Sequence, residues 1–272
     1  MHIKKYIALC MLVIIFLVRA GMEKGNYGWS KDLTESIIEE DKGRVEKLLQ
    51  NKKMDVNRKS GNPLLNLIPE CGQVLPIEAA LETQNYDIIK DLIEAGAVVD
   101  ETYEGDQNPI AAALLRGCKK QNFKTVELLL EHGADPDGNA EEGVPLLIIS
   151  ELYIDIYSTE EERQEAQEQL VKLYELVYKN CKEKRPADEG GETSLDYAAV
   201  SKNNQLVRYL VEQLGYDVNA QDHDGQTPLI NLMYNGSDQE SKKETARLLK
   251  QYGADESIRD KKGKTAEDYE KE

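Results

Sequence analysis

Three candidate metal ligands stand side by side in the tripeptide Asp-His-Asp at 222–224. Carboxylate and imidazole groups bind divalent cations, so this cluster is the first place where the chain could carry chemistry. An EF-hand loop requires a ligand at its first position and a glutamate at its last. When Gly225 is aligned with the loop glycine, Ala220 falls on the first position and Asn231 on the last. The cluster does not match a calcium loop, and the sequence predicts no metal site.

Other catalytic arrangements are also missing from the sequence. The chain has three histidines, at positions 2, 132 and 223, and no His-x-x-x-His or Glu-x-x-His motif. The Gly-Gly pair at 190–191 lies among acidic residues, which would repel a phosphate rather than bind it. The sequence therefore predicts a protein without enzymatic activity and without a cofactor. An enzyme with an unrecognised site is the remaining alternative.

The composition of the 272-residue chain favours a helical protein with an acidic surface. Charged residues make up 31%, aromatic residues only 6%, and the formal net charge is -17. Few aromatic residues beside many Leu, Ile, Ala and Glu are typical of helical proteins. The negative charge repels the phosphates of nucleic acids and of anionic lipids. We therefore expect no nucleic-acid partner, and a partner that uses this charge should be basic.

Residues 1–20 are predicted to be a secretory signal. The basic start MHIKK is followed by an apolar run over residues 6–18, which is shorter than the roughly 20 residues of a spanning helix. Small residues stand at Val18 and Ala20, ahead of a cleavage before Gly21. Arg19 is unusual at such a site, so an uncleaved membrane anchor is the alternative. We expect an exported protein, periplasmic or secreted, in which 21–30 form a lead-in.

A repeated pattern organises the rest of the chain. Turns that carry Pro or Ser before an aliphatic residue occur at 76, 109, 145, 194 and 228, which gives spacings of 33, 36, 49 and 34 residues. Each turn precedes a short apolar segment and then a second one with helical periodicity, as at Ile89, Leu92 and Ile93. The second segments end at a glycine such as Gly96, or at Asn180, as expected for a left-handed helix cap.

These phrases resemble those of the ankyrin-repeat family. The best matches are Thr227-Pro228-Leu229, Gly133-Ala134-Asp135, Gly253-Ala254-Asp255 and Asp217-Val218-Asn219. The resemblance covers about residues 31–270 and implies an all-α repeat solenoid, in which helix-turn-helix repeats stack and are joined by hairpin-like turns. We expect an ankyrin-repeat domain over 31–272, with repeats at 31–60, 61–105, 106–141, 142–190, 191–223 and 224–261 and a C-terminal cap at 262–272.

The chain departs from the family pattern in two ways: one position of the repeat lacks a histidine that is often found there, and the fourth repeat is longer than the others. The position after Thr-Pro-Leu often holds a histidine that ties neighbouring turns, but here it holds Glu78, Ala111, Leu147, Asp196 and Ile230. The hydrogen bonds that such a histidine makes between neighbouring turns should therefore be replaced by others or be missing. Apolar stacking between repeats should then provide more of the stability.

The fourth repeat is the longest. Its first helix is expected to extend over 146–157, and its second to span 160–180 after a capping box at Thr159. These two long helices should protrude, either as a tolerated insertion or as a binding or dimerisation feature.

The resemblance implies recognition of another protein by the hairpin tips and the concave helix face. The tips are acidic, so we expect a partner with a basic surface; an acidic exterior that only keeps the chain soluble is the alternative. A narrower alternative is a periplasmic inhibitor or immunity-type protein that neutralises a basic toxin or enzyme. The oligomeric state stays open. The expected contact residues are Asp100, Glu101, Tyr103 as an aromatic anchor, Glu104, Asp106, Glu141, Glu142, Asp188, Glu189, Asp222 and Asp224.

Overall fold

The computed structural model describes residues 33–51, 54–57, 75–99, 110, 120–137, 144–152, 159–235 and 239–271. Every regular element within these ranges is an α-helix, and one isolated antiparallel bridge joins Ala187 to Thr193. The predicted signal and lead-in, residues 1–30, lie outside the described residues. Among the helices in the described ranges, none combines the length and apolar character needed to cross a membrane.

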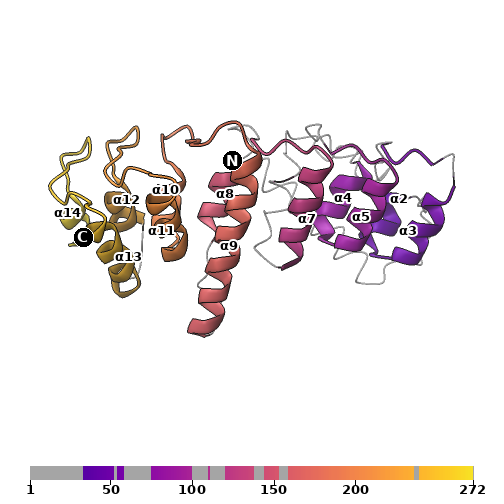
Figure 1. Ribbon diagram of the computed structural model, residues 1–272, viewed down its shortest axis with the longest axis horizontal. Helices are drawn as coiled ribbons and strands as arrows, with labels where there is room; N and C mark the ends of the chain where they lie inside the picture. Colours follow the sequence, from indigo (N-terminus) through magenta and orange to yellow (C-terminus); the bar gives the residue numbers. More distant parts are fainter. Residues whose placement is uncertain are drawn as a thin grey trace, which may run out of the picture. The chain divides into compact units, whose positions relative to one another are not determined.

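Most helices form pairs, in which a short first helix is followed by a second one that runs alongside it (Figure 1). The first helices are α2 (Leu33–Ile38), α4 (Pro76–Thr83), α8 (Pro145–Glu151), α10 (Ser194–Val200), α12 (Pro228–Asn235) and α14 (Ala266–Glu270). The second helices are α3 (Lys42–Leu49), α5 (Tyr86–Glu94), α7 (Lys120–Glu131), α9 (Glu160–Asn180), α11 (Asn204–Glu212) and α13 (Gln239–Gln251).

The chain divides into two compact units, at residues 1–113 with 124–134 and at 114–123 with 135–272. In the first unit, α2 packs on α4 and α3 packs on α5. In the second unit, α8, α10, α12 and α14 pack in succession, while α11 packs against both α9 and α13. Within each unit, helix pairs thus contact one another in succession, as the predicted solenoid requires.

Small and apolar side chains explain this packing. In α4, Ala79 and Ala80 are buried beside Ile77, and their small side chains let a neighbouring helix approach closely. In α5, Ile89 and Leu92 lie on the buried face, as the spacing predicts.

In three of the helix pairs, the turn between the two helices contains a residue with a left-handed backbone conformation, followed by an Asp or Asn that caps the second helix. Glu40, Gln84 and Lys202 have φ angles of 55°, 55° and 59°. The next residue caps the second helix by accepting from a backbone N–H three residues on, as in Asp41 to Arg44 N, Asn85 to Ile88 N and Asn203 to Leu206 N. The sequence analysis did not identify this turn.

Glycines end most second helices as predicted. Gly96 has a φ of 94°, and the N–H of Ala97 donates to the carbonyl of Leu92, which is the pattern of a Schellman cap. The prediction of a left-handed cap at Asn180 is wrong. Asn180 is the last helical residue of α9, and the chain leaves in an extended conformation at Cys181. The Asn180 amide instead donates to the carbonyl of Leu176, one turn back in the helix.

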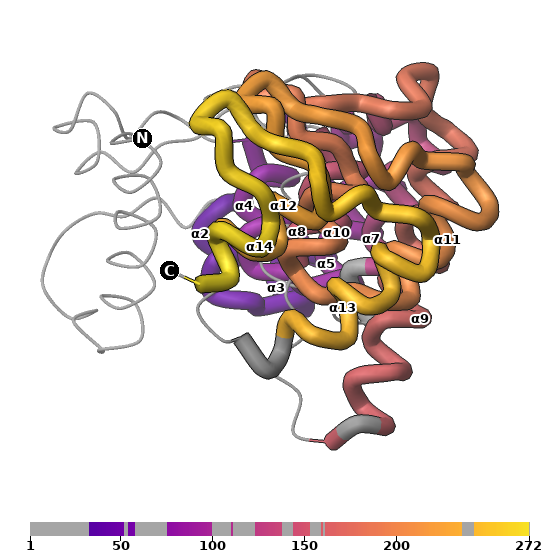
Figure 2. Tube along the Cα trace, turned by 90° about the vertical axis from the view of Figure 1, so that its left-hand side faces the viewer, coloured from indigo at the N-terminus to yellow at the C-terminus, as the bar shows by residue number. Residues whose placement is uncertain are grey.

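Two long helices were expected in the fourth repeat, and the structure confirms the second of them. Helix α9 begins at Glu160 after a capping box between Thr159 and Glu162, and it extends well beyond α8 and α11 (Figures 1 and 2). The expected extension of the first helix is wrong, because α8 ends at Glu151. The Ser150 carbonyl at its end accepts from the Ser201 hydroxyl at 2.8 Å, which fastens this end to the end of α10.

Candidate protein-interaction surface

Three hairpin turns of the second unit share the sequence Asp-x-x-Gly-x-Thr, and we call them joints. They span 188–193, 222–227 and 260–265, each directly before a first helix. The aspartate Oδ1 accepts from the backbone N–H four residues later, which closes the turn. The distances are 2.8 Å for Asp188 to Glu192 N, 2.8 Å for Asp222 to Gln226 N and 2.9 Å for Asp260 to Lys264 N.

The second carboxylate oxygen of each joint aspartate is also occupied. It accepts from a side chain nine residues later, in the following first helix. The donors are the Tyr197 hydroxyl to Asp188 at 2.8 Å, the Asn231 amide to Asp222 at 3.2 Å and the Tyr269 hydroxyl to Asp260 at 2.5 Å. The threonine at the end of each joint caps the helix: Thr193, Thr227 and Thr265 accept from N–H groups of its first turn.

These bonds give Asp222 a structural role in place of the metal chemistry that its neighbours suggested. Its Oδ1 accepts from the N–H of Asp224 as well as from that of Gln226, both at 2.8 Å. The described residues contain no group of three His, Cys, Asp or Glu side chains arranged to hold a metal ion.

Neighbouring joints contact one another directly. The N–H of His223 donates to the carbonyl of Gly190 at 2.7 Å, and His223 Nδ1 lies 3.0 Å from the carbonyl oxygen of Glu189. One joint later, the N–H of Lys261 donates to the carbonyl of Asp224 at 2.8 Å. Gly191 permits the first of these contacts, because its φ is 82° and a Cβ there would lie 2.9 Å from His223. The three joints therefore form one continuous edge of the second unit.

Four of the predicted contact residues lie on this edge. Asp188 and Asp222 are only partly exposed, and both use their carboxylates to hold their own joints. Glu189 and Asp224 are exposed, so their carboxylates remain open to a partner. The other predicted contact residues lie outside the described residues: Asp100, Glu101, Tyr103, Glu104, Asp106, Glu141 and Glu142.

A buried acidic group lies beneath the joints. The Asn231 amide donates to both Asp196, at 3.1 Å, and Asp222, which links α10 to α12 and to the joint. Burial raises the pKa of Asp196, although hydrogen bonds from Thr193 and Asn231 oppose the shift. Asp196 occupies the position where the family often has histidine, so the expected tie between neighbouring turns is replaced here by an aspartate–asparagine pair.

Glu192 has the most perturbed carboxyl group of the edge. Burial, reinforced by the negative charges of Asp188, Asp196 and Asp222, raises its pKa to about 7. Asp260 behaves in the opposite way: burial favours its neutral form, but the Tyr269 hydroxyl and the N–H groups of the joint outweigh this effect and lower its pKa. The two carboxyl groups differ because only Asp260 receives several hydrogen bonds that favour its charged form.

A second set of contacts links the ends of successive second helices. In the first unit, the Asn57 amide donates to the carbonyl of Gly96 and accepts from the N–H of Val98. In the second unit, Asn219 makes the same two bonds, to Gly253 and Asp255. Asp137 occupies the equivalent position two repeats before Asn219. Its carboxylate cannot donate, and it accepts from the N–H groups of both Lys182 and Glu183.

One aromatic residue missed by the sequence analysis is exposed near the last joint. Tyr234, in α12, is 51% exposed, and it is the one large apolar side chain that the described part of the chain leaves open to solvent. Its ring lies 5.2 Å from that of Tyr269 in an edge-to-face arrangement. In the sequence, a tyrosine at the end of a short apolar helix gives no sign that it is exposed.

The comparisons with known proteins agree with this architecture. The family model described as ankyrin repeats (many copies) matches residues 195–239, which cover α10 from its second residue onward and all of α11 and α12. The ankyrin repeat domain of human ASB11 is similar to the structure with a TM-score of 0.63 and 21% identity, over 88% of this chain and 91% of that one. The ankyrin repeat domain of Bcl-3 gives a TM-score of 0.58 and 19% identity, over 88% and 93%. No curated protein matches the sequence.

Proposed function

We propose that this chain, which has the fold of ankyrin repeat domains, is a non-enzymatic interaction module that binds a basic protein partner. The proposed contact surface consists of the two acidic joints of the edge, 188–193 and 222–227, and the adjoining face of the first helices. The observation that carries the proposal is the direct stacking of the joints at 188–193 and 222–227, which places exposed acidic side chains on one edge.

The joints are suited to binding because their backbones are already fixed. Asp188 and Asp222 close their own turns and anchor them to the next helices, so Glu189 and Asp224 project from ordered loops. A surface that is ordered before binding loses less conformational entropy when the partner arrives. Loops held by a rigid scaffold are a common place for recognition.

The charge of the chain supports a basic partner. A net charge of -17 attracts a cationic protein over a distance and accelerates the encounter at low ionic strength. The Debye length is about 8 Å at physiological ionic strength, so the exposed carboxylates of the edge would act mainly at short range. We expect the association rate to fall as salt is added.

Charge reversal on the edge tests the proposal. The partner would be captured from an envelope fraction with the tagged chain, purified, and titrated against a Glu189→Lys/Asp224→Lys variant. We expect at least a tenfold loss of affinity, because like charges that face each other across an interface cost several kcal/mol. The matched control is Glu168→Lys/Glu244→Lys, which changes the net charge equally at exposed positions of α9 and α13. Equal losses in both variants would show that only net charge matters and would refute the edge as the binding surface.

The proposal extends to predicted contact residues outside the described ranges. A Glu101→Lys/Glu104→Lys/Glu141→Lys/Glu142→Lys variant should also weaken binding of the captured partner, beyond the effect of four reversals elsewhere. Unchanged affinity in this variant would remove these residues from the surface and leave the edge of the second unit as the proposed contact.

Export is the other part of the proposal, and it rests on the apolar run over residues 6–18. Cell fractionation followed by N-terminal sequencing tests it. We expect a mature chain that begins at Gly21 in a periplasmic or secreted fraction. A membrane fraction that retains Met1 would indicate the uncleaved anchor, and a cytoplasmic chain that retains Met1 would contradict export.

A further inference from the structure

The charge of the joint edge reverses at its C-terminal end. The segments 186–192 and 220–226 carry three and two acidic residues and no Lys or Arg, which gives -3 and -2 with histidine neutral. The corresponding segment 258–264 carries Arg259, Lys261, Lys262 and Lys264 against Asp260 alone, which gives +3. A chain of net charge -17 thus places four cations within six residues, on the joint that ends the edge.

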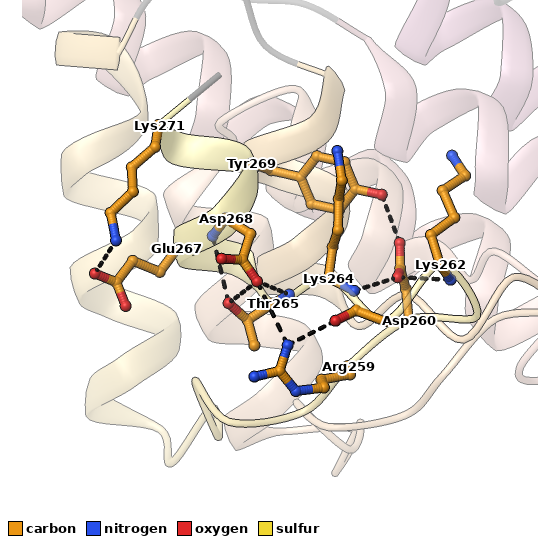
Figure 3. Close-up of polar contacts among 10 residues, drawn as sticks. Arg259, Asp260, Lys262, Lys264, Thr265, Glu267, Asp268, Tyr269 and Lys271 are labelled. Carbon is orange, nitrogen blue, oxygen red and sulfur yellow. Dashed lines mark hydrogen bonds and ion pairs between the residues drawn. The ribbon is translucent and has the colours of Figure 1, made fainter.

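Two of these cations remain available to a partner. Arg259 donates to the carbonyl of Gly263 at 2.6 Å and lies 3.6 Å from Asp268, so its charge is partly used within the joint (Figure 3). Lys261 and Lys262 are exposed, and neither forms an ion pair with any residue in the described ranges. Their positions are nevertheless defined, because the N–H of Lys262 donates to Asp260 and that of Lys261 donates to the preceding joint.

Aromatic rings lie directly beside the cations. Lys262 Nζ is 4.9 Å from the centre of the Tyr234 ring, and Lys264 Nζ is 4.8 Å from the centre of the Tyr269 ring. The Tyr269 hydroxyl donates to Asp260, which holds the ring in place, and the Lys264 side chain extends along the Tyr269 ring (Figure 3). Tyr234 packs edge-to-face on Tyr269 and remains 51% exposed. An exposed tyrosine supported by a buried one, with cations at its margin, has the composition of an interface hot spot.

We propose that the C-terminal joint and Tyr234 form a second interaction surface, which binds an acidic segment of a protein partner. Lys261 and Lys262 would bind carboxylates of the acidic segment. The Tyr234 ring would pack against the apolar part of a side chain that lies between these carboxylates. The Tyr234 hydroxyl makes no hydrogen bond with any of the described residues and can donate to a carboxylate. This surface has the opposite charge to the surface in the proposed function and does not depend on it.

An acidic protein segment fits this surface better than a nucleic acid. The positive region covers one joint, and Asp224 of the preceding joint lies immediately beside Lys261. A nucleic acid is a long polyanion that would extend from this patch over the acidic joints, where its phosphates are repelled. A short acidic segment can remain within the patch, because screening limits the repulsion from more distant carboxylates to about one Debye length, roughly 8 Å.

Fluorescence anisotropy of a short fluorescein-labelled poly-glutamate peptide, added to the full chain at low salt, tests the inference. We expect saturable binding, at least tenfold weaker in a Lys261→Glu/Lys262→Glu variant. A Tyr234→Ala variant, which keeps every charge, should lose about fivefold or more, as expected for truncation of an interface aromatic. The matched control is Lys172→Glu/Arg247→Glu, which makes the same change in net charge at exposed positions of α9 and α13.

Three results would overturn the inference. They are the absence of peptide binding by the unaltered chain, an equal loss in the control variant, and tighter binding of a single-stranded oligonucleotide of equal charge. Circular dichroism establishes that each variant is folded. The Glu189→Lys/Asp224→Lys variant separates the two surfaces: it should keep or improve peptide binding, whereas the Lys261→Glu/Lys262→Glu variant should keep its affinity for the basic partner.

Discussion

At the scale of the residue, neighbouring aspartates in the same joint have different roles. Asp222 accepts from two backbone N–H groups and from Asn231, whereas the Asp224 carboxylate is exposed and forms no hydrogen bond or ion pair with the described residues. Removing a carboxylate that closes a turn leaves its N–H donors without that acceptor. Removing the exposed carboxylate leaves nothing unsatisfied.

The first prediction compares these two positions. Asp222→Ala should lower the free energy of unfolding by about 1.5–3 kcal/mol, because it removes hydrogen bonds to a charged acceptor. Asp224→Ala should change it by less than about 0.5 kcal/mol, as is usual for an exposed side chain. Urea unfolding followed by circular dichroism measures both. Equal effects would mean that the bonds of Asp222 add nothing to stability.

The second prediction concerns the pH dependence that Glu192 contributes. Its pKa is about 7 in the folded chain against an ordinary value of 4.5, so between these values the folded state binds more protons than the unfolded state. Stability from this group is therefore present at acidic pH and is lost as pH rises from about 4.5 through 7. Glu192→Gln mimics the protonated form, so the variant should gain stability relative to the unaltered chain as pH rises.

The comparison requires urea midpoints of both proteins from pH 5 to pH 8. Glu189→Gln is the control, because that carboxylate is exposed on the same joint. A difference between the unaltered chain and Glu192→Gln that stays constant with pH would contradict the assigned shift.

At the scale of the element, the sequence was most informative where the signals are local. The capping box at Thr159 and the periodicity after it predict α9 at 160–180, and the structure has the same bounds. The end of α8 was not predictable in this way, because it is set in part by the bond between Ser201 and Ser150, which are 51 residues apart. Long-range contacts leave no local signal in a single sequence.

The candidate surface was predictable in outline but not in the orientation of its side chains. An acidic turn has the same composition whether its carboxylate faces solvent, like that of Glu189, or accepts from its own backbone, like that of Asp188. The triple occurrence of Asp-x-x-Gly-x-Thr was the available signal, since a motif repeated at each joint indicates a structural role.

The third prediction compares two helix N-caps: Thr159, at the protruding start of α9, and Thr193, at the start of α10, which packs between two other helices. Thr159→Ala should raise amide hydrogen exchange about fivefold within residues 163–166 of α9, because a lost N-cap costs about 1 kcal/mol. The effect should stay local, since these residues precede Gln167, which accepts from the N–H of Gln205 in α11, and the start of α9 extends beyond α8 and α11 (Figure 2). Thr193→Ala removes the cap of α10, which packs between α8 and α12, and should lower the stability of the second unit instead. A global loss from Thr159→Ala would show that the extension is coupled to the second unit.

At the scale of the whole molecule, stability should be distributed along the chain. Within each unit, helix pairs pack on their neighbours, and the amide bridges of Asn57 and Asn219 connect one repeat to the next. In such an array, stability is approximately a sum of repeat terms and nearest-neighbour terms. Removing one amide bridge should therefore destabilise the adjacent repeats, and the loss of stability should decrease with distance along the sequence.

The fourth prediction tests this distribution at Asn219. Asn219→Ala removes two bonds, to Gly253 and Asp255, and should destabilise the last repeats by about 1–2 kcal/mol. Hydrogen exchange measured by mass spectrometry should then quicken in α13 and α14 and stay unchanged in α4 and α5 of the first unit. Asn57→Ala is the matched change, because it removes the same pair of bonds in the first unit, and it should give the reverse pattern. Faster exchange in both units from either substitution would mean that the array unfolds as a single cooperative block.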